Sequence, residues 1–201
     1  MTSLSKIKVM TCDVTQSFNN MHKEITSIQP QLISWHKGHS GSYILNVDGS
    51  AQTNPGMAGI GGLIRYFDGQ FMHGFHGNID YLNILHAKIL ALMHGIQICW
   101  EEGLKDIICY TDSMHIIHLV QHADISTHHY DNEIAIIRKY MAKDWTFNLC
   151  HTLREGNMCA DFLAKLGTRY TSDLLIVFDP PAELCLLLTA DNMSVAYHCG
   201  Q

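Results

Sequence analysis

The stretch from Tyr43 to Phe67 reads YILNVDGSAQTNPGMAGIGGLIRYF, and it decides the fold. Its first part, YILNVD, alternates between two faces, as a β-strand does. The following NPGMAG is rich in turn-forming residues. GIGGLIRYF, together with the later DGQ and FMHGFHG, has the pattern of a hairpin of two further strands. Three strands in succession predict an antiparallel meander.

Helices and strands alternate after the meander. LHAKILALMHGIQICWEEG has apolar residues at helical spacing and ends in Gly103, a residue typical of helix ends. Five more segments follow: the strand DIICYTD, a helix capped by Ser113, the helix YDNEIAIIRKYMAK, the strand DWTFNLCHTL and a short helix capped by Asn157. This order predicts an α/β fold. We expect a five-stranded mixed sheet, with three antiparallel strands then two parallel ones, and helices on both faces.

The length of the chain suits one domain. Its 201 residues, 47% of them hydrophobic, can bury one substantial core but not two ordinary ones. We expect a lead-in segment at residues 1–40, the α/β domain at 41–168, and a tail at 169–201. The tail is apolar but broken by Pro180 and Pro181, and it either packs on the domain or binds a partner.

Charge and cysteine usage restrict the partners and the compartment. The formal net charge of −6 excludes a strongly basic nucleic-acid-binding chain, so any contact with a polyanion must be local or metal-assisted. The seven cysteines form no CxxC pair, and we expect no dedicated zinc site among the 14 histidines. With no apolar stretch long enough to span a membrane, we expect a reduced, intracellular protein.

Two aspartates follow strand-like segments. Asp48 ends YILNVD and Asp112 ends DIICYTD. If these strands are parallel neighbours, the two carboxylates meet at one edge of the sheet, where they repel unless a proton or a hard cation lies between them. An oxygen-only cluster suits Mg²⁺ or Mn²⁺. The alternative is that Asp48 starts a turn and Asp112 caps a helix.

Four separated motifs within residues 43–167 resemble the plant-type ribonuclease H domain associated with reverse transcriptases. They are LNVDGSAQTNPGMAGIGGLIR, HAKILALMHGIQICWEEG, IICYTDS and LREGNMCADFLAKLG. The resemblance implies a ribonuclease H-like fold. It also implies an enzyme that cuts the RNA strand of RNA–DNA hybrids, using four carboxylates that hold two Mg²⁺ or Mn²⁺ ions. Asp48, Asp112 and Asp161 match three of these catalytic metal ligands.

The fourth carboxylate position departs from the family pattern. Where the family has a glutamate in A-E-L, this chain has Lys88 between Ala87 and Ile89. Position 88 shares a helix stripe with Ala91 and Gly95, so we expect Lys88 to point inward, to pair with the aspartates and to weaken or displace at least one metal ion. The alternative is that Lys88 reaches solvent and one-metal activity survives.

Further residues resemble the substrate-binding positions of the family. The turn that contains Asn54 and Gly56 resembles one that meets RNA 2′-hydroxyls, although Asn-Pro-Gly is also an ordinary turn. Arg154 is suited to contact a phosphate. His151 fits a core or surface histidine better than a catalytic one.

Two functions therefore stand as hypotheses. The first is an endoribonuclease for RNA–DNA hybrids that Lys88 weakens or inactivates. The second is a catalytically silent module, derived from a retroelement ribonuclease H, that binds nucleic acid or protein.

Overall fold

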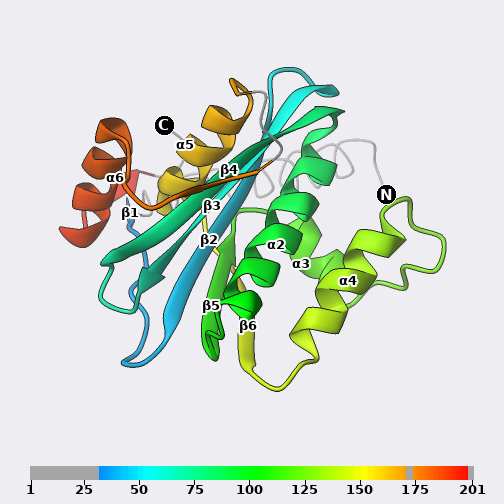
Figure 1. The fold of residues 1–201 in the computed structure, drawn as a ribbon, viewed down its shortest axis with the longest axis horizontal. Helices are drawn as coiled ribbons and strands as arrows, with labels where there is room; N and C mark the ends of the chain where they lie inside the picture. Colours follow the sequence, from blue (N-terminus) through cyan, green and yellow to red (C-terminus); the bar gives the residue numbers. More distant parts are fainter. Residues whose placement is uncertain (1–31, 171–173, 199–201) are drawn as a thin grey trace, which may run out of the picture. The chain divides into compact units, whose positions relative to one another are not determined.

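The computed structural model describes residues 32–170 and 174–198. The described residues between 33 and 197 belong to one compact unit. Most of the expected lead-in segment lies outside the described residues. None of the described helices is long and apolar enough to cross a membrane. Figure 1 shows the arrangement of the described helices and strands.

The larger unit is built on a six-stranded mixed sheet in the order β6-β5-β2-β3-β4-β7. The strands are β2 (Tyr43–Ala51), β3 (Gly56–Tyr66), β4 (Phe71–Leu82), β5 (Asp106–Thr111), β6 (Thr146–His151) and β7 (Leu175–Val177). As predicted, β2, β3 and β4 pair antiparallel, β5 adds parallel to β2, and β6 adds parallel to β5. The predicted α/β class with a mixed sheet is confirmed.

The predicted count of five strands is one too low. β7 comes from the tail and pairs antiparallel with β4, with Phe75 opposite Ile176. β7 has only three residues, which is too few to show the alternating pattern of a strand in the sequence. Two very short strands, β1 (Leu32–Ile33) and β8 (Tyr197–His198), form a separate two-stranded sheet.

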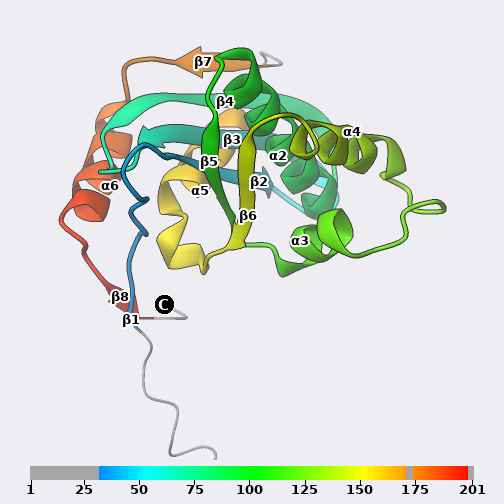
Figure 2. The same cartoon turned by 90° about the horizontal axis from the view of Figure 1, so that it is seen from below.

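Helices cover both faces of the main sheet (Figures 1 and 2). They are α2 (Ile84–Glu101), α3 (Met114–Gln121), α4 (Asp131–Met141), α5 (Met158–Gly167) and α6 (Ala182–Asn192), with a 3-10 turn, η1 (Arg154–Gly156). α2, α3 and α4 pack over one apolar cluster, whereas α5 and α6 enclose a smaller one. The predicted cap is present: the Ser113 hydroxyl accepts a hydrogen bond from the amide of Ile116.

Two glycines allow helices to touch the sheet backbone on either side of Asp48. A Cβ at Gly49 would lie 2.4 Å from the backbone of Ala87 and Lys88 in α2, and one at Gly61 would lie 2.1 Å from the amide nitrogen of Ala164 in α5. Any side chain at these positions would push the helix away. The glycines therefore bring α2 and α5 close to the strand that carries Asp48.

Candidate functional site

The candidate site lies where two parallel strands separate. The pairing of β2 with β5 runs from Tyr43 opposite Ile107 to Asn46 opposite Tyr110. Asp48 and Asp112 each lie two residues beyond the last pair. Ligands of open α/β sheets bind in the crevice beyond the carboxyl ends of such strands. The sequence prediction that these two aspartates are neighbours agrees with this placement.

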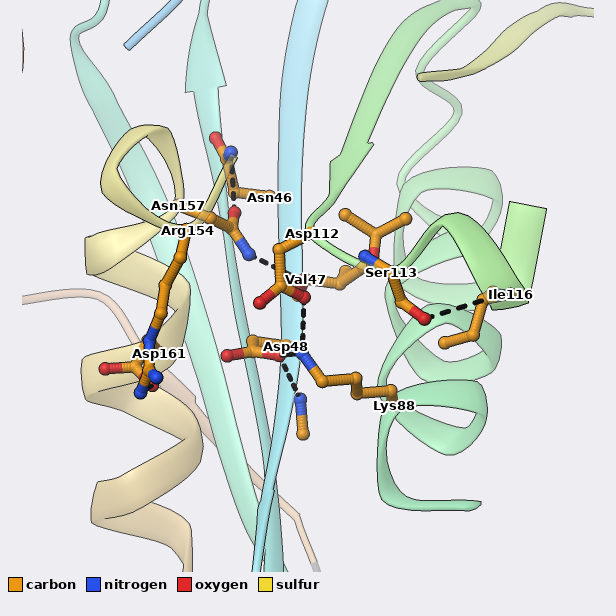
Figure 3. Close-up of polar contacts among 12 residues, drawn as sticks. Asn46, Val47, Asp48, Lys88, Asp112, Ser113, Ile116, Arg154, Asn157 and Asp161 are labelled. Carbon is orange, nitrogen blue, oxygen red and sulfur yellow. Dashed lines mark hydrogen bonds and ion pairs between the residues drawn. The ribbon is translucent and has the colours of Figure 1, made fainter. Parts of the chain in front are cut away.

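The side chain of Lys88 lies between the two aspartates (Figure 3). Its ammonium group donates a hydrogen bond to Oδ1 of Asp48 and another to Oδ1 of Asp112. The side chains of Lys88, Asp48 and Asp112 are only 14%, 4% and 16% exposed. Lys88 therefore points inward, as expected, and occupies the position between the two carboxylates where a cation is needed.

The pKa values of Asp48 and Lys88 are both raised, but for different reasons. Burial raises the pKa of Asp48 from 3.8 to about 6; the charge of Asp112 adds to the rise, and the ammonium of Lys88 opposes it. The pKa of Lys88 is also raised, because both aspartates favour its charged form more than burial disfavours it. Burial therefore dominates the shift at Asp48, whereas the two carboxylates outweigh burial at Lys88.

Asp161, the third predicted carboxylate, has different partners. It lies in the first turn of α5, where Nη2 of Arg154 is 3.2 Å from its Oδ1 and Nζ of Lys165 is 2.6 Å from its Oδ2. The Arg154 and Lys165 side chains are 67% and 50% exposed, so these pairs hold Asp161 weakly. Its charge still contributes to the raised pKa of Asp48, so the three carboxylates influence one another.

The side chains at this edge do not fit a two-metal site as they stand. An ammonium already holds one oxygen of Asp48 and one of Asp112, and cationic side chains hold both oxygens of Asp161. Across residues 32–170 and 174–198, no three His, Cys, Asp or Glu side chains are grouped so that they could hold a metal ion. A second cation close to the Lys88 ammonium would be repelled in this poorly solvated position.

The predicted substrate-binding residues lie on the segments around this edge. Oδ1 of Asn54 accepts a hydrogen bond of 3.1 Å from the amide of Ile84, so the β2–β3 loop is joined to the start of α2. Gly56 follows that loop, and a Cβ there would collide with Thr53. Arg154 approaches from η1. The loop and Lys88 are therefore connected through the same helix.

A buried pair of asparagines was not anticipated as part of this edge. Asn157 is the N-cap residue of α5, as predicted, but its side chain makes no capping hydrogen bond. Its Oδ1 instead accepts from Nδ2 of Asn46 at 3.0 Å, and its own Nδ2 donates to the carbonyl of Val47 at 3.0 Å (Figure 3). The signal in the sequence was Asn46, a polar residue inside an otherwise apolar strand.

The sheet order, the crossing helices and the aspartates at the separating strands define a ribonuclease H-like domain. The RNase H1 of Halobacterium salinarum has the same fold, with a TM-score of 0.58 and 23% identity over 64% of this chain and 98% of that one. LC11-RNase H1, whose structure is of a complex with RNA/DNA hybrid, has a TM-score of 0.58 and 25% identity over 63% of this chain and 96% of that one.

Residues 46–167 match the reverse transcriptase-like family, and the chain belongs to that family. The resemblance found in the sequence is thereby confirmed. A protein of Arabidopsis thaliana, provisionally named as a ribonuclease H, is 28% identical over 135 residues, which are 67% of this chain and 22% of that protein. The chain therefore spans about a fifth of the length of this relative.

Proposed function

We propose that this domain binds nucleic acid of the RNA–DNA hybrid type at the edge formed by Asp48, Asp112 and Asp161, and that Lys88 leaves hydrolysis of the RNA strand weak or absent. The observation that carries the proposal is the ammonium of Lys88, which is hydrogen-bonded to both buried aspartates. Mg²⁺ or Mn²⁺ would supply the activated water and stabilise the leaving oxygen in the family reaction. The side chains of this chain hold a lysine where such an ion would sit.

The fold and the surrounding segments support binding. LC11-RNase H1 is described in complex with RNA/DNA hybrid, and this chain shares its fold. The loop with Asn54 and Gly56 is suited to read 2′-hydroxyls in a shallow minor groove, and the exposed Arg154 is suited to meet a phosphate. Because the chain has a net charge of −6, we expect modest affinity, with a dependence on salt set by the few cationic side chains that meet phosphates.

The test compares binding and cleavage of one labelled RNA–DNA hybrid. Binding is followed by fluorescence anisotropy in EDTA at two salt concentrations, and cleavage is followed on gels in Mg²⁺ and in Mn²⁺. The variants are Lys88→Glu, Asp48→Asn, the two changes combined, and Lys37→Glu. Lys37 is exposed and lies outside the site, so Lys37→Glu changes the net charge equally without touching the pocket.

We expect the natural chain to bind and not to cut, and only Lys88→Glu to gain cleavage that Asp48→Asn abolishes. Cleavage by the natural chain that Asp48→Asn removes would show that Lys88 does not block the site. Absence of binding by every variant would favour the alternative of a protein-interaction module.

A further inference from the structure

A buried arginine connects the C-terminal helix to the centre of the sheet. Arg65 in β3 is fully buried, and its Nη1 donates to Oδ2 of Asp191 in α6 at 2.7 Å. Its Nη2 donates to Oδ1 of Asn46 in β2 at 2.7 Å. The guanidinium also lies 3.8 Å from the ring centroid of Trp35. Asp191 thus supplies a carboxylate for a charge that lies far from solvent.

The same chain of hydrogen bonds continues to the candidate site. Asn46 donates to Asn157, which in turn donates to the carbonyl of Val47, the residue before Asp48. Asn157 directly precedes α5, and its carbonyl accepts the amide of Asp161 at 3.1 Å. Hydrogen bonds therefore run without interruption from α6 through two strands to the first turn of α5.

Helix α6 lies outside the part of the chain that defines the family. The family match ends at residue 167, whereas α6 begins at Ala182. Besides Asp191, α6 contributes Leu184 and Leu188 to the apolar cluster beneath α5. The Cys159 thiol, in the first turn of α5, also donates to Oδ2 of Asp191 at 3.3 Å. α6 thus joins the hydrogen-bond network through Asp191, and it packs against α5 through its apolar residues.

We propose that Asp191 is a positioning residue for the site: through Arg65, Asn46 and Asn157 it holds the first turn of α5, and with it Asp161, in place beside Asp48. The inference rests on the proposed function and assigns part of the site to a helix beyond the family match. Without Asp191, the buried guanidinium has lost its carboxylate partner and must move or admit water. Either change takes the Nη2 donor away from Oδ1 of Asn46, which then keeps only the Nε1 donor of Trp35. The Asn46 side chain that donates to Asn157 is thereby held less firmly.

The competing explanation is that Asp191 and Arg65 only stabilise the fold. The double variant Arg65→Met, Asp191→Leu separates the two, because a buried ion pair can often be replaced by apolar side chains without loss of stability. This variant removes the charges but leaves Asn46 without the Nη2 donor. A second variant, Asp191→Asn, keeps an acceptor of the same shape. Leu186→Ala, on the exposed side of α6, is the control.

The primary readout is amide hydrogen exchange in residues 157–162, compared with exchange in α2 and with the thermal midpoint. It needs no nucleic acid, so it can fail independently of the proposed function. We expect both Asp191 variants to exchange faster in residues 157–162 by about tenfold or more, while exchange in α2 stays unchanged. In the Lys88→Glu background, the same variants should lose cleavage of the hybrid.

The inference would be overturned if the double variant had the thermal midpoint of the natural chain and also the same amide exchange rates in residues 157–162. If the double variant does not fold, Asp191→Asn decides the question, measured well below its own midpoint. Equal acceleration in α2 and in residues 157–162 would then show that the pair stabilises the whole domain and does not position α5.

Discussion

Lys88 reaches from the first turns of α2 to Asp48 in β2 and donates to the same Oδ1 that accepts the amide of Gly49 at 2.8 Å. The contact depends on Gly49, since any larger residue there would force the backbone at Lys88 away. A buried carboxylate next to a second one needs a cation. In this chain the cation is part of the protein, so the cluster should be stable without metal.

Magnesium is expected to leave the stability of the natural chain unchanged. A ligand stabilises a protein only when it binds the folded state, and Lys88 already occupies the position between Asp48 and Asp112. Lys88→Glu should be less stable in EDTA, because three carboxylates then face one another, and should gain about 2–3 kcal/mol when Mg²⁺ reaches roughly a hundred times its Kd. Thermal unfolding with EDTA and with Mg²⁺ measures this. Metal would bind despite Lys88 if Mg²⁺ raised the thermal midpoint of the natural chain and of Lys37→Glu but not that of Asp48→Asn.

Asp48→Asn should raise stability most at neutral pH. The pKa of Asp48 is about 6 in the folded chain and 3.8 ordinarily, so folding favours its protonated form. The contribution of protonated Asp48 to the free energy of unfolding is fully present below about pH 4 and is lost as the pH rises through 6. A shift of about two pKa units corresponds to roughly 3 kcal/mol.

Urea unfolding of the natural chain and of Asp48→Asn at several pH values between 4 and 7.5 tests this expectation. The stability advantage of Asp48→Asn should grow with pH through that window. An advantage that is constant or that shrinks would mean that the Lys88 ammonium, and not burial, dominates the titration of Asp48.

Gly61→Ala should destabilise the domain by displacing α5. The new Cβ would lie 2.1 Å from the amide nitrogen of Ala164, a backbone atom that cannot rotate away. Overpacking of this kind typically costs about 1–3 kcal/mol or more. Gly103→Ala is the comparison, since its Cβ meets open space and only its φ of 74° is strained, at a cost of about 1–2 kcal/mol. Chemical unfolding compares the two, and a loss well below about 1 kcal/mol for Gly61→Ala would show that α5 shifts at little cost.

Arg138→Met should loosen the end of α3. The guanidinium in α4 donates to the carbonyls of Leu119, Val120 and Ala123 at 2.7–2.8 Å, and it satisfies groups that a helix end leaves free. Methionine keeps most of the aliphatic stem, so the expected loss of about 1.5–3 kcal/mol comes from the charged hydrogen bonds. Lys139→Met, at an exposed neighbouring position, should have little effect. Unfolding curves compare the two variants, and equal stability would contradict the role given to Arg138.

Much of the candidate site could be read from local patterns. Asp48 and Asp112 stood out because each ends an apolar strand, and Lys88 stood out because it replaces a glutamate on a stripe of small residues. The i, i+4 spacing of Asp161 and Lys165 also carried a signal that the sequence interpretation did not use. Asn157 is the N-cap residue of α5, as its position in the sequence indicates, but its side chain makes no capping bond because a buried partner in β2 competes for it.

By itself, the sequence determined the order of strands and helices, the antiparallel meander, the three carboxylates and the lysine among them, because these depend on periodicities and motifs within short segments. Only the tertiary structure decided that β7 extends the sheet, that Arg154 and Lys165 hold Asp161, and that Asp191 meets Arg65. Arg65 and Asp191 lie 126 residues apart, and no local pattern marks such a pair. Their pairing follows from the cost of leaving a buried charge without a partner, and that cost arises only once the chain has folded.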